Sequence, residues 1–285
     1  MTTELRLALV GSAVDHSPSP AMHRAALAAI GRRGDYEAVS VAADGLADCL
    51  QALRAGGVTG VNVTIPHKEA VLGLVARLDP GAAAIGAVNT LSAVTGGWSG
   101  HNTDTTGLAR LLDAHSLDGA TALVLGAGGM ARAAVAALRP RCGHVAVANR
   151  DPRRARRLVE ELTHRQGERA PGAALSALAL AEREALEAAL ASATVLINAT
   201  SVGMHAPEAS PLPAEVGLGA VTLVCDAVYT PADTALLRRA RAAGATVVDG
   251  LLLLAAQAAD SFALWSGERV PDAIFRTAAA RMPTP

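Results

Sequence analysis

The chain has 285 residues, 51% of them hydrophobic, so it is long enough for two domains and can bury extended sheets. Its formal net charge of −1 at pH 7 argues against a polyanion such as nucleic acid as the main partner. No apolar run reaches the roughly 18 residues of a membrane span, and the first residues lack a signal-peptide pattern, so we expect a cytoplasmic protein without a membrane partner. The cysteines, Cys49, Cys142 and Cys225, have no CxxC spacing, and therefore neither a disulfide framework nor a metal site is expected.

The N-terminal part alternates between strand-like and helix-like patterns, which is typical of an α/β fold. We expect strands at 5–10, 36–41, 58–63, 87–94 and 98–102, the last two joined by a turn at Gly96-Gly97. Helices are expected at 18–30, at 45–55 and from residue 67 to 76. No nucleotide-binding pattern occurs in this part of the chain.

The remaining residues have the pattern of a doubly wound, Rossmann-like sheet. A strand at 121–125 runs into a glycine-rich turn, which is followed by an alanine-rich helix up to Leu138. Further strands are expected at 144–148, 194–197, 222–226 and 246–248, with a weaker one at 174–180 and helices between them. Six strands are enough for such a sheet. Two helices follow, at 251–265 and 271–280, without signs of a further domain.

The glycine-rich turn predicts a dinucleotide site. Gly126-x-Gly128-x-x-Ala131 lies between a strand and a helix, where this motif must lie. The first glycine permits the tight turn, the second lets the backbone approach a pyrophosphate, and the small third residue allows close helix packing. The helix N-terminus then faces the phosphates.

The end of the following strand favours NADP over NAD. NAD enzymes usually have an acidic residue there that accepts hydrogen bonds from the ribose 2′-OH. Here Asn149-Arg150 is followed by Arg153 and Arg154, and a guanidinium suits a 2′-phosphate. Asp151 could serve a 2′-OH or could cap the next helix, with Pro152 at the first helical position, and we favour the cap.

Three segments before this region are unusually rich in polar residues. The first is His16-Ser-Pro-Ser-Pro-Ala-Met-His23, in which two hydroxyls at the start of a helix make a plausible carboxylate cradle. The second, Gly60-Val-Asn-Val-Thr-Ile-Pro-His-Lys-Glu69, places Asn62 and Thr64 on one strand face with Lys68 in the next helical turn. The third comprises 86–90 and 102–104. Each segment could be an ordinary cap or turn, but three of them before a nucleotide domain indicate a substrate site.

These segments resemble the signature blocks of the shikimate dehydrogenase family. The matching blocks are HSxSPxxH, NVTxPxK, GAVNT and NTD, followed in the expected order by the GAGG turn, Asn149-Arg150, Asn198–Met204, Asp226–Thr234 and Gln257-Ala-Ala. The resemblance covers nearly the whole chain. It implies a substrate-binding domain at 1–103, an NADP-binding domain at 104–249, and C-terminal helices at 250–285 that pack on the substrate domain.

The resemblance also implies roles for individual residues. Lys68 and Asp104 become the catalytic pair, and Ser17 and Ser19 bind the shikimate carboxylate. Substrate contacts are further implied for Asn62, Thr64, Asn89, Asp104, Tyr229 and Gln257. NADP contacts are implied for Gly126, Ala127, Gly128, Gly129, Met130, Asn149, Arg150, Arg154, Thr200, Ala227 and Gly250.

Some residues depart from the family pattern. Asp15 and Ala13 stand where the family usually has glycine and often has proline, and Arg24 replaces a common asparagine. An aspartate beside the carboxylate cradle would repel the substrate or would pair with Arg24. Leu252 and Leu253 stand where a DGxGM-like run has glycine and methionine. These departures bear on substrate preference more than on the type of reaction.

Lysine chemistry fits the implied reaction, which is the reversible NADPH-dependent reduction of 3-dehydroshikimate to shikimate in aromatic amino-acid biosynthesis. Lys68 is the one lysine among 25 basic residues. Lysine can hold a proton, release it and stabilise an oxyanion, whereas arginine does not deprotonate usefully. Asp104 would favour the charged lysine, and the sequence does not assign acid and base roles within the pair.

Two other functions remain open at this point. One is a quinate/shikimate or aminoshikimate dehydrogenase of catabolic or secondary metabolism. The other is a non-catalytic NADP-binding regulator that keeps the fold, against which the intact Lys68, Asp104, Ser17 and Ser19 speak. In each case the partner is a small molecule, and the protein is expected to be a monomer or a homodimer.

Overall fold

The computed structural model describes residues 4–166, 172–204 and 206–281, and the chain separates into two compact units. Unit 1 comprises Met1–Gly107 together with Ala255–Pro285, and unit 2 comprises Leu108–Leu254. The sequence-based boundaries after residues 103 and 249 fall in the first turn of α4 (Thr103–Leu112) and directly before α9 (Gly250–Ser266). These two helices run across the limits of the units. The α/β fold class and the return of the C-terminal helices to the first unit are confirmed.

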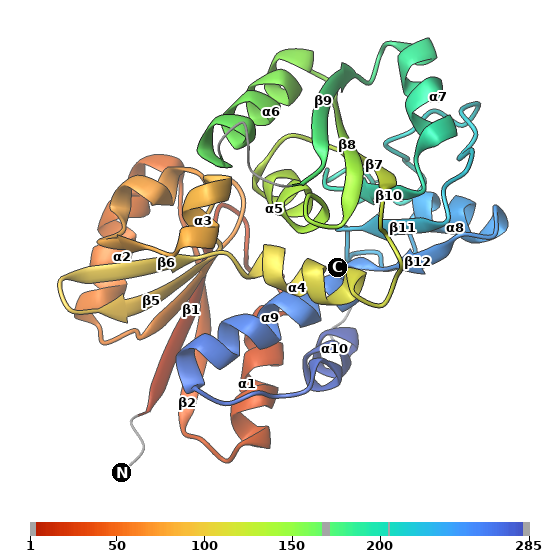
Figure 1. Ribbon diagram of the computed structural model, residues 1–285. Helices are drawn as coiled ribbons and strands as arrows, with labels where there is room; N and C mark the ends of the chain where they lie inside the picture. Colours follow the sequence, from red (N-terminus) through yellow and green to blue (C-terminus); the bar gives the residue numbers. More distant parts are fainter. Residues whose placement is uncertain (1–3, 167–171, 205, 282–285) are drawn as a thin grey trace. The chain divides into compact units, whose positions relative to one another are not determined.

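Unit 1 is built on a mixed sheet with the strand order β2-β1-β3-β5-β6-β4 (Figure 1). The strands are β1 (Leu5–Gly11), β2 (Gly34–Ser40), β3 (Gly60–Val63), β4 (Arg77–Leu78), β5 (Thr90–Val94) and β6 (Gly97–His101). The first three run parallel, whereas β5 is antiparallel to both of its neighbours. The turn expected at Gly96-Gly97 joins β5 to β6, and both glycines have positive φ.

The two faces of this sheet carry different side chains, because successive residues of a strand point to opposite sides. Val61 and Val63 of β3 belong to a hydrophobic core that also contains Leu46 and Leu50 of α2 (Leu46–Ala55). Asn62, between them, points to the other face, where it bonds to α9. That face is covered by α1 (Ser19–Ala29), α9 and α10 (Asp272–Ala280), and it carries the polar groups of the candidate site.

Several elements of unit 1 differ from the sequence-based expectation. The helix expected at 67–76 is wrong: residues 65–69 form turns, followed by the short 3-10 helix η2 (Ala70–Leu74). In a regular helix the Lys68 carbonyl would accept the N–H of Leu72, but here it accepts the N–H of Val88 at 2.8 Å, and Leu72 donates to the Glu69 carbonyl instead. Lys68 therefore lies in a turn.

Two helices were not expected from the sequence, although both have clear start signals. In α3 (Pro80–Ile85), the Asp79 carboxylate accepts the backbone N–H groups of the first turn, Pro80 is the first residue, and Gly86 follows with φ of 64°. This is the usual combination of an Asp cap, an N-terminal proline and a C-terminal glycine. At α4, Asn102 Oδ1 accepts the N–H of Thr105 at 3.0 Å, as a capping residue does.

Unit 2 contains a fully parallel sheet in the order β12-β11-β10-β7-β8-β9. The strands are β7 (Ala120–Leu125), β8 (Cys142–Asn149), β9 (Ala174–Ala179), β10 (Val195–Asn198), β11 (Leu223–Asp226) and β12 (Thr246–Val248). The helices are α5 (Gly129–Leu138), α6 (Pro152–Gln166), α7 (Arg183–Ser192) and α8 (Ala235–Ala242). The expected doubly wound sheet is confirmed, including the weaker strand, which is β9.

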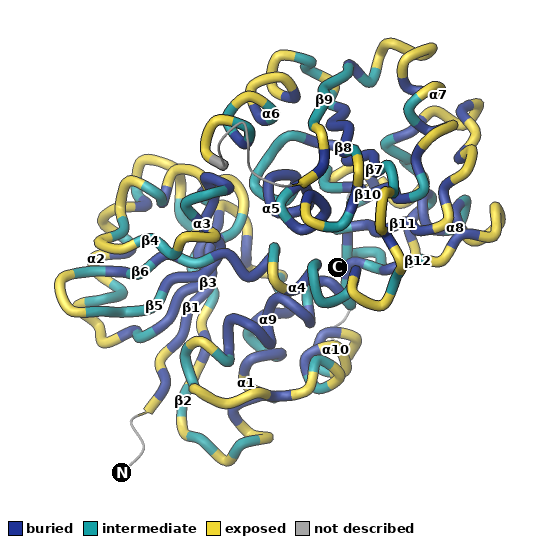
Figure 2. Tube along the Cα trace, in the orientation of Figure 1, coloured by how far each residue is buried: buried dark blue, intermediate teal, exposed yellow. Residues whose placement is uncertain are grey.

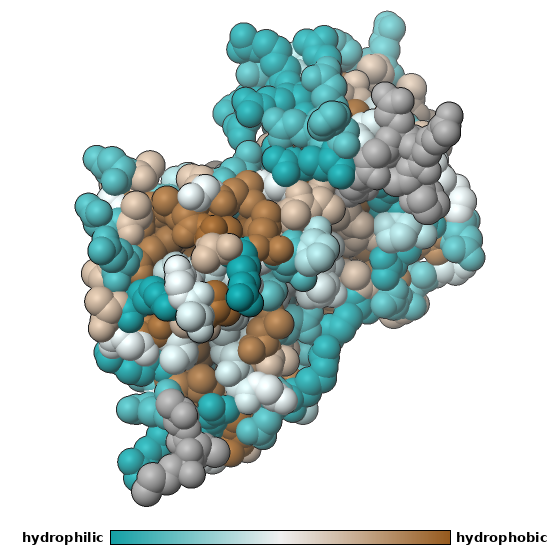
Figure 3. All heavy atoms as spheres, turned by 60° about the vertical axis from the view of Figure 1, so that its left-hand side comes forward, coloured by the Kyte–Doolittle hydropathy of each residue, from teal (hydrophilic) through white to brown (hydrophobic). Residues whose placement is uncertain are grey.

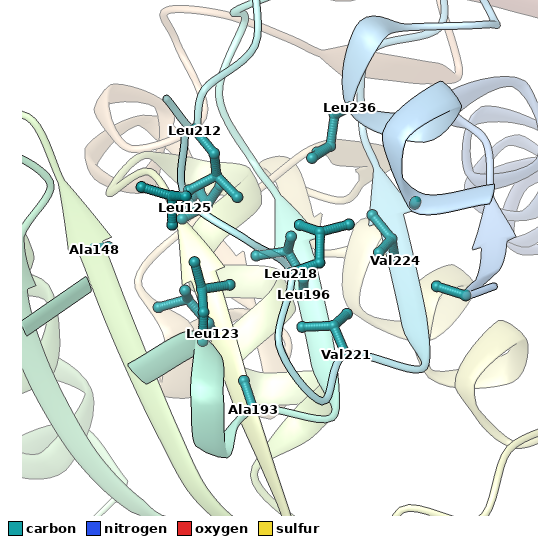
Figure 4. Close-up of a cluster of buried hydrophobic side chains, with 14 of the residues drawn as sticks. Leu123, Leu125, Ala148, Ala193, Leu196, Leu212, Leu218, Val221, Val224 and Leu236 are labelled. Carbon is teal, nitrogen blue, oxygen red and sulfur yellow. The ribbon is translucent and has the colours of Figure 1, made fainter. Parts of the chain in front are cut away.

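Burial in unit 2 follows from this arrangement. All residues of β10 and β11 are buried, and Figure 2 shows both strands in dark blue. Figure 4 shows Leu123, Leu196 and Val224, from three neighbouring strands, in one cluster with Leu218 and Leu236. Such near-continuous apolar strands are expected where helices cover both faces of a parallel sheet.

The surfaces of the two units differ in polarity. Figure 3 shows hydrophobic residues gathered on a face of unit 1, whereas unit 2 presents mainly hydrophilic atoms in that view. Exposed large hydrophobic side chains in unit 1 include Ile65 and Leu74. Among the described residues, no helix combines the length and the apolar character that crossing a membrane requires.

Candidate active site

Lys68 and Asp104 form an ion pair in unit 1. Lys68 Nζ donates to Asp104 Oδ2 at 2.6 Å, and the two side chains are only 16% and 8% exposed. The Lys68 carbonyl accepts the N–H of Val88 at 2.8 Å, which fixes the turn after β3. Asp104 lies in the first turn of α4, where the helix dipole favours a carboxylate. The fold thus brings together the two residues that the sequence indicated for proton transfer.

The two serines of the expected carboxylate cradle lie side by side. Ser17 precedes α1 and Ser19 begins it, and their Oγ atoms are 3.1 Å apart. The Ser19 N–H donates to Ser17 Oγ at 3.2 Å, and Ser19 is 6% exposed. Thr64 follows β3 and is half-buried, with its N–H donated to Val10. Two hydroxyls at a helix N-terminus can donate to one carboxylate.

Asn62 and Asn89 make hydrogen bonds to several buried groups. Asn62 Oδ1 accepts from the Tyr36 hydroxyl at 2.8 Å, and its Nδ2 donates to Ser261 Oγ at 2.9 Å and to the Asn89 carbonyl at 3.3 Å. Asn89 Oδ1 accepts the N–H of Thr103 at 2.7 Å, so its Nδ2 faces the Oε1 of Gln257 at 3.4 Å. The amide of Asn62 is therefore occupied by protein partners.

Four buried residues of this region have no role of their own among the site residues that the sequence implied. Thr90, Thr103 and Ser261 exchange hydrogen bonds of 2.9–3.0 Å, and Tyr36 connects them through Asn62. One signal was available for Ser261: it lies four residues after Gln257, on the same face of α9. Thr90 and Thr103 lie in the third polar segment of the sequence, whereas no local pattern distinguishes Tyr36 from an ordinary strand residue.

The structure decides between the two alternatives for Asp15. Arg24 does not pair with it, because Arg24 Nε donates to Asp35 at 2.6 Å and its Nη2 donates to the Tyr36 carbonyl. Asp15 instead accepts from Ser40 Oγ at 3.1 Å. That hydroxyl also accepts the N–H of Val14 at 3.3 Å. The Asp15 carboxylate is thus bonded to the end of β2, and the alternative in which it pairs with Arg24 is wrong.

The histidines near these motifs are packed against other protein groups and are not placed for proton transfer. His23 is fully buried and stacks on Tyr36 with ring centroids 4.3 Å apart, and burial lowers the pKa of His23 to about 3. His67 is also buried, with its Nε2 2.9 Å from the Val41 carbonyl. For His101, burial lowers the pKa. Among the described hydrogen bonds, none joins any of these three rings to Lys68 or Asp104.

The glycine-rich turn of unit 2 has the geometry that a dinucleotide needs. Gly126 has φ of 112°, and a Cβ there would lie 3.0 Å from the Ala199 carbonyl oxygen, so another residue would be strained. Gly128 stands at the N-terminus of α5, and no atom lies within 4 Å of the position of a Cβ. Ala127, Gly129 and Met130 are half-exposed beside it. The helix N-terminus is therefore open to a phosphate.

The strand after this turn ends in cations. Arg150 and Arg154 are exposed, and Asn149 Nδ2 donates to the Asp151 carbonyl at 3.0 Å. The cap predicted for Asp151 is confirmed, because its Oδ1 accepts the Arg153 N–H at 3.0 Å. The Arg153 guanidinium also contacts this carboxylate and, together with the backbone bond, lowers the pKa of Asp151. Asp151 is thereby engaged by its own helix.

The remaining residues implied for cofactor contact follow the carboxyl ends of β10, β11 and β12. Thr200 donates through Oγ1 to Asn198 Oδ1 at 2.7 Å, and Asn198 Nδ2 donates to Asp226 at 2.8 Å. Ala227 follows β11 and donates its N–H to Asn198. A Cβ on Gly250 would lie 2.2 Å from the Val228 carbonyl oxygen, so only glycine fits there. The carboxyl end of a doubly wound sheet is where such folds bind ligands.

The two residue sets divide between the units. Unit 1 contains every residue implied for substrate and catalysis except Tyr229, which lies after β11 in unit 2, half-buried and with its pKa raised by burial. Unit 2 contains all residues implied for NADP. The open glycine turn and the exposed arginines fit a phosphorylated dinucleotide.

Comparison with known proteins agrees with this geometry. Residues 9–91 match the model of the shikimate dehydrogenase substrate binding domain, and residues 108–214 match that of shikimate / quinate 5-dehydrogenase. A shikimate dehydrogenase (NADP(+)) of Natronomonas pharaonis is 43% identical over 264 residues, which cover 92% of this chain and 94% of the relative.

Solved structures are similar over the same length. Shikimate 5-dehydrogenase of Thermus thermophilus, in complex with NADP(H) and shikimate, has a TM-score of 0.85 and 40% identity, covering 98% of this chain and 100% of that one. Quinate dehydrogenase of Corynebacterium glutamicum, in complex with NAD, has a TM-score of 0.83 and 31% identity, covering 97% and 99%.

Proposed function

This chain belongs to the shikimate dehydrogenase family, and we propose that it catalyses the reversible NADPH-dependent reduction of 3-dehydroshikimate to shikimate. It is an oxidoreductase that acts on a small molecule and uses NADP(H). The observation that carries the proposed mechanism is the 2.6 Å contact of Lys68 with Asp104 in the unit that also contains the serine pair.

We propose that Lys68 supplies the proton in the direction of reduction. The bound cofactor contributes the hydride, and the ketone oxygen must gain a proton as negative charge develops on it. Lys68 Nζ can donate to that oxygen and stabilise its charge, while Asp104 holds the ammonium in place. In the direction of oxidation the pair takes the proton from the hydroxyl. Because the two groups touch, they exchange this proton as one unit.

The binding residues have separate tasks in this proposal. Ser17 and Ser19 bind the substrate carboxylate, while Asn89 and Gln257 hold ring hydroxyls from positions fixed by Thr103. Thr64 and Tyr229 complete the substrate contacts, and Asn62 acts by holding its buried neighbours. Such fixed groups lower the cost of orienting the substrate.

For the cofactor, we propose that the Gly126–Met130 turn holds the pyrophosphate and that Arg150 and Arg154 bind the 2′-phosphate. The proposed NADP contacts also include Asn149, Thr200, Ala227 and Gly250. The engagement of Asp151 by Arg153 supports NADP, because a carboxylate held by its own helix is not directed at a 2′-OH.

Quinate is the second candidate substrate, favoured by the family model that names it and by the 31% identical quinate dehydrogenase. Steady-state kinetics on shikimate and quinate, each with NADP and NAD, separates the two. We expect the highest kcat/KM for shikimate with NADP. A clear preference for quinate with NAD would overturn the proposal. If neither substrate is turned over, the proposal also fails, and the non-catalytic NADP-binding regulator becomes the better explanation.

We further propose a cytoplasmic location and a monomer or homodimer. A biosynthetic enzyme that depends on NADPH needs the cofactor pool of that compartment. Sedimentation velocity over a range of protein concentrations would distinguish a monomer from a dimer.

A further inference from the structure

Asp226 is a buried carboxylate of unit 2 that the proposed mechanism does not use. It is the last residue of β11 and is 1% exposed. Among the described residues, its hydrogen-bond partners are an amide, a backbone N–H and a hydroxyl, and none of them is a cation. A buried charge without a cation is costly unless hydrogen bonds replace its water. The donors around Asp226 therefore indicate what the carboxylate holds in place.

Both oxygens of Asp226 accept hydrogen bonds from other segments. Oδ1 accepts from Asn198 Nδ2 at 2.8 Å and from the N–H of Val228 at 3.0 Å. Oδ2 accepts from the Thr234 hydroxyl at 2.7 Å, while Thr234 Oγ1 itself accepts the N–H of Leu237 at 3.2 Å. Burial raises the pKa of Asp226, and the three bonds oppose that rise. One carboxylate thus joins the end of β10, the segment after β11 and the start of α8.

The first of these bonds leads to Thr200. The backbone N–H of Thr200 can only donate, and it donates to Asn198 Oδ1 at 3.1 Å. The amide nitrogen of Asn198 must therefore face Asp226. The same Oδ1 accepts from the Thr200 hydroxyl at 2.7 Å, and Asn198 is completely buried. The position of the carboxylate thus sets the position of Thr200, which is a proposed NADP contact.

The second bond leads to the segment after β11. Val228 lies between Ala227, a proposed NADP contact, and Tyr229, a proposed substrate contact. Its N–H bond to Asp226 fixes the backbone of both neighbours. A Cβ on Gly250 would lie 2.7 Å from the backbone nitrogen of Tyr229, so the Gly250 backbone packs directly on this segment. The contacts proposed for the two ligands therefore share one support.

We propose that Asp226 is a positioning residue for both ligands of unit 2. Through Asn198 it holds the cofactor contact Thr200. Through Val228 it holds the substrate contact Tyr229. Its third bond, to Thr234, reaches neither contact and serves the start of α8. This inference rests on the proposed function, which assigns these contacts to NADP and to the substrate.

The two bonds at Oδ1 predict different results for three variants. Asp226→Ala should weaken the binding of NADPH and of shikimate by roughly two- to tenfold each, which is the worth of about one net hydrogen bond. Asn198→Ala should weaken NADPH only, because Val228 keeps its bond. Asp226→Asn should restore both affinities, since its Oδ1 can still accept from Asn198 and Val228 and its Nδ2 can donate to Thr234 Oγ1.

NADPH is titrated by its fluorescence, and shikimate by calorimetry into protein saturated with NADPH. Shikimate and NADPH are both in the reduced state, so they do not react with each other during the titration. Thr234→Val is the matched control, because it removes the bond at Oδ2 and the cap of α8. It should lower the melting temperature and leave both affinities unchanged. The proposal is overturned if Asp226→Ala keeps either affinity, if Asp226→Asn binds as weakly as Asp226→Ala, or if Thr234→Val binds as weakly.

Asn198→Ala covers the case in which Asp226→Ala does not fold. It leaves the carboxylate with two donors and leaves the Asn198 carbonyl bonded to the N–H of Ala227 at 2.9 Å. Wild-type NADPH affinity in this variant, or an equal loss for NADPH and shikimate, overturns the inference. Shikimate turnover by the wild-type protein tests the proposed function separately, and the NADPH titration needs no turnover, so the two failures are distinguishable.

Discussion

The substrate residues of unit 1 and the cofactor residues of unit 2 are constructed in opposite ways. In unit 1, Asn62, Asn89, Asp104 and Gln257 are at most 8% exposed and hydrogen-bonded to other protein groups. In unit 2, the implied contacts come from an open backbone turn and from exposed arginines. In the proposed function, the small polar substrate would therefore bind to polar groups that are already fixed, whereas the large charged cofactor would bind to a backbone turn and to long side chains. Substitutions of the buried residues in unit 1 should change both the reaction rate and the stability, whereas substitutions of the exposed residues in unit 2 should lower cofactor affinity without lowering stability.

The largest effect is expected from Lys68→Ala. Without the ammonium, the proton transfer loses its donor and kcat should fall by about 10² to 10⁴-fold, the range of general acid–base catalysis. Lys68→Arg should be nearly as slow, because it keeps the charge but cannot release a proton. NADPH binding, followed by cofactor fluorescence, should be unchanged in both. Full activity of either variant would contradict the mechanism.

Loss of the exposed cations should weaken the cofactor without touching the fold. Hydrogen bonds to charged groups are worth about 1.5 to 3 kcal/mol, so Arg150→Ala or Arg154→Ala should each raise the KM for NADP by roughly ten- to a hundredfold. The KM for NAD and the melting temperature should stay as in the wild type. The control is Arg156→Ala, because Arg156 is an exposed arginine of α6, the helix that contains Arg154, and is outside the implied set. An equal rise in the KM for NADP and for NAD would show that these arginines do not bind the 2′-phosphate.

The two glycines of the turn provide a matched pair within unit 2. Gly126→Ala forces a side chain onto positive φ and against the Ala199 carbonyl, which should cost about 1 to 3 kcal/mol in the free energy of unfolding. Gly128→Ala meets no protein atom, so it should keep wild-type stability and lose NADPH affinity. Chemical denaturation and cofactor titration of both variants check this. If Gly128→Ala keeps the wild-type affinity for NADPH, the pyrophosphate does not bind beside Gly128.

The smallest expected effect is a pH dependence of stability from His23. Its folded-state pKa is lowered to about 3, while the unfolded chain keeps a pKa near 6.5. Between these values the unfolded chain binds a proton that the folded chain does not. The contribution of neutral His23 to the free energy of unfolding is therefore fully present above pH 6.5. It is lost as the pH falls, by at most about 1.4 kcal/mol per pH unit. Urea unfolding at pH 7, 6 and 5 should show this slope, and His23→Phe should reduce it. An equal slope in the variant would assign it to other groups.

The sequence was most informative where function requires fixed residues in consecutive positions. The segment ending in Lys68 and the turn starting at Gly126 contain several such residues each, and the alternation of strands and helices gave the doubly wound sheet. Asp79-Pro80 precedes α3 in the same way as Asp151-Pro152 precedes α6, but no helix was expected at 80–85.

The remaining residues could not be found from local patterns, because their roles arise from tertiary contacts. Tyr36 reaches Asn62 only after β2 pairs with β1 and β1 pairs with β3. Ser261 reaches this group because α9 returns to unit 1 after the whole of unit 2 has been formed. A tyrosine in a strand and a serine in an apolar helix are each unremarkable in the sequence. The pairing of Asp15 with Ser40 is another contact of this kind.

The single lysine also gives the folded chain a single site for a lysine-specific protease. Such an enzyme has one peptide bond to cut, Lys68–Glu69. In the native protein the Lys68 side chain is held by Asp104 and its carbonyl by Val88, so cleavage requires local opening of this turn. The rate of appearance of two fragments, 1–68 and 69–285, would therefore report the opening of the segment that contains Lys68, without any label or substitution.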